Sequence, residues 1–295
     1  MQDKIFSFRW DIDHLYGLEK GVPNILSVCR DYDIKCSFYI NLGKAFNFKE
    51  WLLKSLRKSF DKLTDTNSIN IIQKLGYLNL FHLIVFNPNV GLSRIDLLKR
   101  IIDEGHELGL HGAMNHMLWS RRIWDFDIDT IEKMLQEAIL EFKKNLGINI
   151  LGFASPGFSW SRESMVCIDR IGFAYSGDLW GEKPFYPKLD GTTFNHMCLP
   201  VTLIGPNTVP IIEYHSSFGK SDDEIADIVL KEIEKKDFAV IYGHPVFEGF
   251  KTDILRKIFS FVLENGYEIL KHDEIYERYK GNSLEEDVFS QMICA

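Results

Sequence analysis

Two segments far apart in the chain carry residues that could bind a metal and hydrolyse a bond. Asp11 and Asp13 stand two residues apart at the end of an apolar run, and His111 and His116 follow another. Carboxylate and imidazole together are a typical ligand set for a catalytic divalent metal. An Asp-His-His set leaves room for a water molecule, which the metal turns into a hydrolytic nucleophile. The spacing therefore predicts a hydrolytic metal centre.

Two further polar residues stand where strands are expected to end. His244 follows the apolar run 239–242, and Asp178 follows the run 173–176. In a parallel barrel all strand carboxyl ends open on one face, so these residues should converge with the first two segments. A period of two also places Arg9, Asp11 and Asp13 on one strand face, where an Arg9–Asp11 ion pair could be purely structural. Core packing alone hardly explains four polar strand ends.

The elements that would position these residues alternate between strands and helices. Apolar runs suited to strands alternate with segments of helical periodicity, which is the pattern of a parallel α/β sheet. The number of units, about seven or eight, favours an irregular (β/α) barrel of the TIM-like kind. The expected strands are 5–10, 36–42, 108–111, 150–154, 173–176, 198–203, 238–242 and 267–270, and the expected helices are 22–32, 93–104, 128–146, 161–171, 222–236 and 252–264.

The whole pattern predicts one domain, residues 1–279. Residues 46–89 interrupt the alternation after the second strand and are rich in Leu, Phe and Lys, so we expect a helical insertion there. Residues 177–207 form a proline-rich loop of the kind that covers active sites in barrels. Residues 280–295 begin with polar residues and are expected to be a mobile C-terminal tail.

Composition excludes several classes of protein. The net charge is −8, which argues against nucleic-acid binding and against a polybasic membrane anchor. No apolar stretch reaches membrane-spanning length, and the start of the chain leaves no room for a signal peptide. Five scattered cysteines without a C-x-x-C pair indicate reduced thiols. We therefore expect a cytoplasmic protein, with peripheral contact at the inner membrane face left open and the oligomeric state unspecified.

Several motifs in order resemble one known family. They are the segments Arg9–His14 with Gly21-Val-Pro, Ser37–Asn41, Gly109-Leu-His with His116 and Trp119, Gly172–Asp178, Leu199-Pro-Val-Thr-Leu, and Tyr242-Gly-His through Glu248-Gly. In this order they resemble the polysaccharide deacetylases of the NodB type, the carbohydrate esterase family 4-like enzymes. The likeness is strongest to the branch of lipid-linked formamido-arabinose deformylases, which carry a long insertion after the second strand.

The resemblance implies a role for each matching residue. Asp11 matches the general base and Asp13 the metal-binding aspartate of the family. His111 and His116 match its two metal-binding histidines, and His244 matches its general acid. Asp178 could orient His244 or contact substrate.

The sequence departs from the family pattern at three places, one of which is the Asp-x-Asp motif of Asp11 and Asp13 in place of adjacent aspartates, a variant that this branch shares. The metal-binding histidines are usually four residues apart, but Asn115 occupies that position here and His116 comes one later. Alignment on Trp119 favours His116 as the ligand, with Asn115 as the weaker candidate. Many members also carry an arginine before the turn that here contains Pro156, where this chain has none; Arg9 is proposed to hold Asp11 instead.

The implied activity is hydrolysis of an N-acyl group, acetyl or formyl, on a sugar or sugar-lipid. The implied cofactor is a divalent metal, foremost zinc, with cobalt, nickel or manganese as alternatives. Trp10, Trp119, Phe158, Trp160 and Trp180 could stack on a sugar or pack in the core. Two other functions stay open: an amide hydrolase acting on a small non-sugar substrate with the same fold, and a non-catalytic sugar-binding relative.

Overall fold

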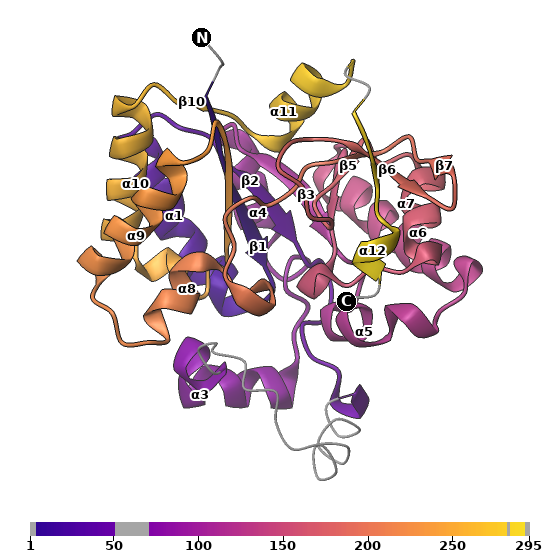
Figure 1. Cartoon of the computed structure of the whole chain (residues 1–295). Coiled ribbons are helices and arrows are strands. Elements are labelled where there is room, and N and C mark those ends of the chain that lie inside the picture. Colours follow the sequence, from indigo (N-terminus) through magenta and orange to yellow (C-terminus); the bar gives the residue numbers. More distant parts are fainter. Residues whose placement is uncertain (1–3, 51–70, 282–283, 293–295) are drawn as a thin grey trace.

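The computed structural model describes residues 4–50, 71–281 and 284–292, and in them a curled parallel sheet forms the centre of the molecule (Figure 1). Its strands run in the order β10-β1-β2-β3-β4-β5-β8, and β9 pairs with β1. All of these pairings are parallel. The strands are β1 (Ile5–Ile12), β2 (Ser37–Ile40), β3 (Glu107–His111), β4 (Gly152–Ala154), β5 (Tyr175–Ser176), β8 (Met197–Cys198), β9 (Phe238–Gly243) and β10 (Glu268–Ile269).

A few backbone hydrogen bonds link the segment after β8 to β9. After β8, the backbone N–H groups of Thr202 and Leu203 both donate to the carbonyl of Val240 in β9. Leu203 also forms an isolated parallel bridge with Ile241. Hydrogen bonding therefore continues from β8 to β9, and the sheet curls into an irregular barrel. The expected α/β barrel class is confirmed.

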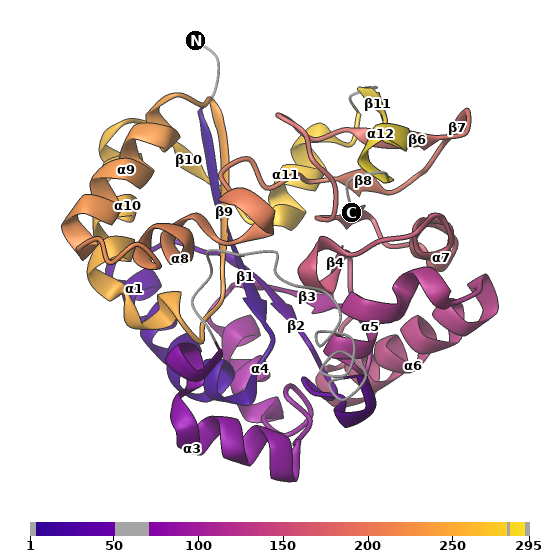
Figure 2. The same ribbon diagram turned by 60° about the horizontal axis from the view of Figure 1, so that its bottom comes forward.

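Helices cover the outside of this sheet (Figures 1 and 2). In Figure 2, α1, α9 and α10 lie on one side, and α5, α6 and α7 lie on the other. The helices are α1 (Val22–Asp31), α3 (Ile71–Phe86), α4 (Ile95–Asp103), α5 (His116–Arg122), α6 (Ile128–Leu146), α7 (Arg162–Ile171), α8 (Ile211–Ser216), α9 (Asp222–Glu234), α10 (Thr252–Glu264), α11 (His272–Tyr279) and α12 (Phe289–Met292).

Strand β1 separates the apolar layer from the barrel interior by the alternation of its side chains. Phe8 and Trp10 belong to the large core under the helices, where their rings stack with centroids 4.0 Å apart. The intervening Arg9 points into the barrel, with its guanidinium 5.3 Å from the ring of Tyr39. A period of two thus buries aromatic rings on one face and places the polar residues inside the barrel.

Two segments, 46–89 and 280–295, are expected to lie outside the barrel. Of the expected insertion, residues 51–70 lie outside the described part of the chain; residues 71–86 form α3, which kinks at Gly76. Within the expected mobile tail, Glu285–Asp287 forms β11, which pairs with β6 (Tyr186–Leu189), and Val288 is buried. Strand β7 (Thr192–Thr193) completes that small sheet. These C-terminal residues therefore pack against the loop 177–207.

The described cysteines form no disulfide, and Cys29, Cys36, Cys167 and Cys198 are all buried. Among the described residues, no helix combines the length and the apolar character needed to cross a bilayer.

Candidate metal centre

Asp13, His111 and His116 come together at the carboxyl ends of the strands. Asp13 Oδ1 lies 3.1 Å from Nε2 of His111 and 3.2 Å from Nε2 of His116. The two imidazole rings have centroids 5.2 Å apart. Their ligand atoms all lie within 4.8 Å of one another, a separation that one ion could span. The structure thus assembles the three residues that the sequence proposes as metal ligands.

The irregular histidine spacing is resolved by where the helix begins. His111 is the last residue of β3, the chain reverses at Gly112 with a φ of 72°, and His116 is the first residue of α5. Asn115 is the N-cap of that helix, and its side-chain oxygen accepts the N–H of Leu118 at 2.9 Å. Because His111 and His116 lie on different elements, the five-residue spacing does not turn their rings apart. Asn115 is occupied by the cap.

The donor atoms fit a divalent metal. His111 Nδ1 lies 3.0 Å from the carbonyl oxygen of Ala154, so the ring proton sits there and the Nε2 lone pair faces Asp13. Two of the converging atoms, Asp13 Oδ1 and His116 Nε2, are buried without a well-oriented hydrogen bond among the described residues. Buried polar atoms that converge in this way are expected to bind something. A metal with one oxygen and two nitrogen ligands satisfies all three.

The charge state of Asp13 also suits a ligand. Burial by itself would raise the pKa of this carboxyl, but the nearby His116 and His244 outweigh it and hold the pKa well below its ordinary value of 3.8. The carboxylate is therefore ionised, which is the form that binds a metal.

Arg9 holds Asp11 in a fixed orientation beside this cluster. Arg9 Nε donates to Asp11 Oδ1 at 2.8 Å, and Nη2 donates to Oδ2 at 2.7 Å. The third nitrogen, Nη1, donates to the carbonyl of Gly177 at 2.5 Å, and a Cβ at position 177 would lie 2.5 Å from it. Burial would raise the pKa of Asp11, but the charge of Arg9 outweighs it and the pKa is lowered. Asp11 is therefore an ionised, oriented carboxylate that can accept a proton.

His244 also lies near Asp13, against its second carboxylate oxygen. It follows β9 directly, and its Nε2 is 3.6 Å from Asp13 Oδ2. Its Nδ1 is 3.5 Å from Oε2 of Glu213, and its backbone N–H donates to Oε2 of Glu248 at 2.8 Å. Both glutamates are buried. His244 thus faces the metal cluster with one nitrogen and a buried acid with the other.

Neither glutamate is marked as a site residue by the sequence alone. Glu213 lies on α8, which follows a long irregular connection, so neither a strand end nor a helical period marks it. Glu248 lies in the short 3-10 helix η5 (Glu248–Phe250), four residues after His244. That spacing could have suggested a contact with the backbone of His244 in a tight turn.

Asp178 makes its hydrogen bonds to a loop residue, Ser155. Its Oδ1 accepts the backbone N–H of Ser155 at 2.5 Å, and its Oδ2 accepts the Ser155 hydroxyl at 3.0 Å. Burial raises its pKa. The next residues form η3 (Pro156–Phe158), and Pro156 lies against Gly112 in the turn that follows His111. Asp178 therefore fixes the loop that supports the histidine turn.

Most of the aromatic candidates are core residues. Trp10, Trp119 and Trp160 are buried, and Trp119 Nε1 donates to the carbonyl of Ser159 at 3.1 Å. Trp180 is the exception: it is 37% exposed and stacks on Phe158, with ring centroids 5.5 Å apart. Trp180 is thus the member of this set that a bound sugar could reach.

A cavity of about 210 Å³ lies between the segment that follows Asp13 and α3. His14, the residue after Asp13, is part of its wall, and Leu75 and Leu83 of α3 form the apolar part opposite. Its remaining lining residues are Leu15, Tyr16, Glu19, Asn79, His82 and Pro88.

Comparison with curated proteins finds a deformylase relative. The chain is 24% identical over 221 residues to a Shewanella sediminis protein assigned as 4-deoxy-4-formamido-L-arabinose-phosphoundecaprenol deformylase (ArnD), covering 72% of this chain and 69% of the relative. No protein-family model matches the chain.

Solved structures with the same fold are numerous and distant in sequence. A Mycobacterium smegmatis structure assigned as a polysaccharide deacetylase superposes with a TM-score of 0.63 at 15% identity, covering 96% of this chain and 93% of that one. An allantoinase, PuuE, gives 0.60 at 13% identity, with 94% and 90% covered. A family 4 acetyl xylan esterase of Clostridium thermocellum, in complex with a cobalt ion, gives 0.54 at 12% identity, with 96% and 98% covered.

The fold of these structures and the sequence likeness to the deformylase agree with the motifs that run from Arg9 to Glu248. The predicted resemblance is therefore confirmed: the chain has the fold of polysaccharide deacetylase structures and is similar in sequence to a protein assigned as an ArnD deformylase.

Proposed function

We propose that the protein is a metal-dependent amide hydrolase that removes an N-acyl group, formyl or acetyl, from a sugar or sugar-lipid. The observation that carries this proposal is the placement of Asp11 and His244 beside the cluster of Asp13, His111 and His116. Together they provide a base, an acid and three metal ligands at one end of the barrel.

Each residue has a part in the proposed reaction. A divalent metal held by Asp13, His111 and His116 would polarise the amide carbonyl and acidify the attacking water. Asp11, ionised and held by Arg9, takes a proton from that water as its oxygen bonds to the carbonyl carbon. His244 gives a proton to the amine nitrogen as the C–N bond breaks, because an amine does not leave as an anion. Zinc is the metal we expect first, with cobalt, nickel and manganese as the others to test.

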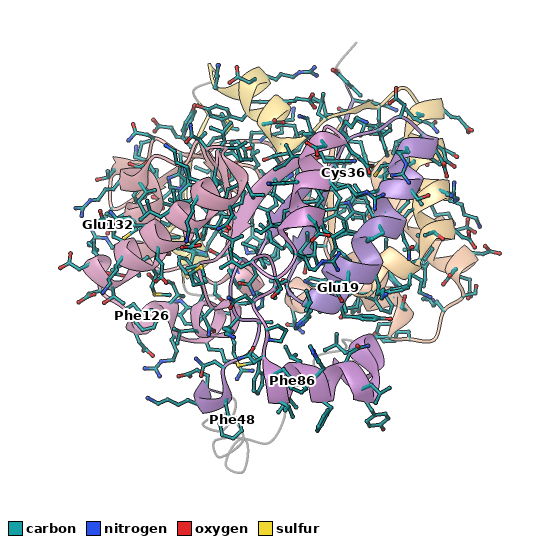
Figure 3. The ribbon with its side chains drawn as sticks, turned by 180° about the vertical axis from the view of Figure 1, so that it is seen from behind. Glu19, Cys36, Phe48, Phe86, Phe126 and Glu132 are labelled. Atoms are coloured by element: carbon teal, nitrogen blue, oxygen red, sulfur yellow. The ribbon has the colours of Figure 1, made fainter. Side chains whose placement is uncertain are left out.

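A lipid-linked sugar is the substrate class that the surroundings of the site favour. The cavity lined by His14, which follows Asp13, also has Leu75 and Leu83 of α3 in its wall and offers room for an apolar group. The outer face of α3 is also apolar, with Leu78 86% exposed and Phe86 65% exposed. Phe86 and Phe48 both lie at this end of the molecule (Figure 3). Exposed apolar patches mark contacts with membranes or other proteins. This placement would suit a cytoplasmic enzyme that meets a lipid-linked sugar at a membrane surface.

The proposal is tested by assaying release of formate or acetate. Protein stripped with a chelator is reloaded with each metal in turn and given N-formyl and N-acetyl amino sugars, free and linked to a polyprenyl phosphate. Asp11→Asn should keep stoichiometric metal and lose turnover, while Asp129→Asn on the exposed side of α6 should change neither. A fully active Asp11→Asn protein would show that the base is misassigned.

A second candidate is hydrolysis of a small non-sugar amide, favoured by the structural likeness to the PuuE allantoinase. Cyclic amides such as hydantoins are assayed beside the acylated sugars, and turnover confined to them would favour this candidate. Protein that binds no stoichiometric divalent metal and turns over neither class would instead favour a non-catalytic sugar-binding role.

A further inference from the structure

Trp180 continues a series of ring contacts that begins at the partner of the proposed base. The Arg9 guanidinium, which holds Asp11, lies 5.0 Å from the centre of the Phe158 ring. Trp180 stacks on that ring, with centroids 5.5 Å apart and an interplanar angle of 12°. Phe158 is 7% exposed, whereas Trp180 is 37% exposed. The stack therefore leads outward from the buried Arg9–Asp11 pair and ends in an indole that a ligand can reach.

Phe158, under this indole, is held in a fixed position. Its backbone φ is 55°, in the left-handed region that bulky side chains rarely adopt, and it follows Gly157, whose φ is 62°. Its ring also meets the Tyr242 ring edge-on, with centroids 5.2 Å apart. A backbone conformation of this kind persists only where the surrounding contacts fix it, and such residues concentrate at active and ligand-binding sites. The base of the stack is therefore preformed.

A residue from the far end of the chain holds the backbone of Trp180. The side-chain oxygen of Gln291 accepts the Trp180 N–H at 2.9 Å, and its side-chain nitrogen donates to the Trp180 carbonyl at 3.0 Å. A primary amide offers both an acceptor and a donor, so it can pair with both polar groups of one backbone residue. Gly181, the next residue, packs closely on Phe185, because a Cβ there would lie 2.6 Å from a ring carbon. Trp180 is thus fixed by two hydrogen bonds and by the packing of the residue that follows it.

The C-terminal segment that carries Gln291 is built into the fold. Strand β11 pairs with β6, and the Val288 N–H donates to a carbonyl of β6 at 3.0 Å. Val288 is fully buried, in a core cluster that includes Leu179 and Phe185. Helix α12 follows Val288 directly, and Figure 2 shows it beside β6. Gln291 therefore reaches Trp180 from an anchored helix.

We propose that this segment completes the substrate site: Gln291 holds Trp180 on Phe158, and the exposed part of the indole is the platform on which the sugar ring of the substrate packs. The inference rests on the proposed amide hydrolysis and adds to it the surface that selects an amino sugar over a small acyl compound without a sugar ring. The C–H face of a pyranose is apolar and packs on an aromatic ring, while its hydroxyl groups stay in water. Gln291 is a positioning residue, because it contacts Trp180 and acts on the sugar through it.

This arrangement predicts a loss of substrate affinity without a loss of chemistry. The platform lies away from the reacting atoms, so it binds the ground state and the transition state alike. For an N-acylated amino sugar that the wild type hydrolyses, Trp180→Ala should raise KM on the order of 10-fold and keep kcat within about twofold. Gln291→Leu, which removes both hydrogen bonds, should raise KM about fivefold, with kcat also kept. Ser290→Ala, an exposed position on the same helix, is the control and should change neither value.

A double variant shows whether Gln291 acts through Trp180. Once the indole is gone, the bonds that hold its backbone no longer affect the sugar, so Trp180→Ala/Gln291→Leu should have the KM of Trp180→Ala. Trp180→Phe, which keeps a smaller ring on the same backbone, should recover part of the affinity. Two results would overturn the inference in favour of a structural role: multiplied effects on KM in the double variant, or a lower kcat with unchanged KM in Gln291→Leu.

A binding measurement does not need turnover. The deacylated sugars glucosamine, galactosamine and 4-amino-4-deoxyarabinose have no acyl group to lose, so they can be titrated against the wild type as purified. Saturation-transfer NMR should show the ring C–H protons of at least one of them in contact with the protein. Trp180→Ala and Gln291→Leu should weaken that binding by about the same factors as for KM. Equal affinity in wild type and Trp180→Ala, or no binding of any of the three sugars, would contradict the platform.

The platform and the proposed hydrolysis can fail separately. A wild type that binds an amino sugar through Trp180 but releases no acyl group from any amide would refute the hydrolysis and leave the platform. A wild type that hydrolyses the amide with the same KM as Trp180→Ala would refute the platform and leave the hydrolysis.

Discussion

Arg9 and Asp11 form a two-point ion pair along one face of β1, inside the barrel and next to the proposed metal ligands. Two nitrogens of Arg9 bind the two oxygens of Asp11 at 2.8 and 2.7 Å, and the arginine is fully buried. Arg9 can contact Asp11 without crossing the barrel, because residues two apart on a strand share a face. The ion pair therefore orients Asp11, the proposed base, and gives the buried Arg9 guanidinium a partner of opposite charge.

Breaking this pair from the arginine side should be costly. Arg9→Met leaves the Asp11 carboxylate buried without its partner, and such a loss typically costs about 3–5 kcal/mol of unfolding free energy. Arg9→Met/Asp11→Asn should recover part of that cost, because no buried charge remains. Urea unfolding of the wild type, both single variants and the double variant measures the coupling energy. Simply additive losses would show that the ion pair contributes no coupling.

His116 and Asn115 should separate cleanly into a metal ligand and a helix cap. His116→Ala should weaken metal binding on the order of 100-fold or more, because it removes a nitrogen that faces Asp13. Asn115→Ala should leave metal affinity unchanged and cost about 1 kcal/mol of stability, because the Leu118 N–H loses its cap. Chelator competition and urea unfolding measure the two quantities. The reverse outcome would make Asn115 the ligand.

Gly21 should be irreplaceable because the backbone of the His244 loop lies against it. A Cβ at Gly21 would lie 1.8 Å from the carbonyl oxygen of Pro245, a clash that no rotamer change relieves. Gly21→Ala should therefore displace the loop, cost about 1–3 kcal/mol of stability and lower kcat, while metal affinity is kept. Gly281→Ala is the control, since a Cβ there meets no atom within 4 Å. Unchanged kcat in Gly21→Ala would show that the loop adapts without disturbing His244.

The sequence predicts most of the fold because its signals are local. The helices 128–146 and 252–264 have the expected bounds, since periodicity and polar ends mark both of them. Strand β1 continues to Ile12, two residues beyond the expected end, because Asp11 is paired with Arg9 and needs no solvent. A buried ion pair within one strand is a tertiary compensation that hydrophobic patterning does not register.

The site residues on strand ends could be proposed from sequence, whereas their partners could not. Asp11, His111 and His244 follow apolar runs, so a parallel barrel places them on one face. The choice between His116 and Asn115 depends on the residue at which α5 begins, and both residue types suit that turn. Glu213 depends on how the connection after β8 folds, and Asp178 is turned toward Ser155 by loop geometry. Neither contact has a local sequence pattern.

The last prediction concerns Glu107, at the opposite end of β3 from His111. Its Oε2 accepts the Ser37 hydroxyl at 2.6 Å and the backbone N–H of Asp273 at 3.2 Å, and its Oε1 accepts the hydroxyl of Tyr175. Burial, with the charge of Asp273, raises its pKa from an ordinary value of 4.5 to about 7. The folded protein therefore binds a proton here, between these two pH values, that the unfolded chain has released.

Because the folded state holds the extra proton, this group makes the protein less stable as the pH rises from about 4.5 to about 7, and its effect is constant above that range. The full loss is on the order of 3 kcal/mol, from 1.36 kcal/mol per pKa unit. Glu107→Gln should abolish this part of the pH dependence, so its unfolding free energy relative to wild type rises across the window. Urea unfolding from pH 5 to 8 measures the difference, with the exposed Glu137→Gln as control. Parallel curves for Glu107→Gln and wild type would mean that Glu107 titrates alike in the folded and unfolded states.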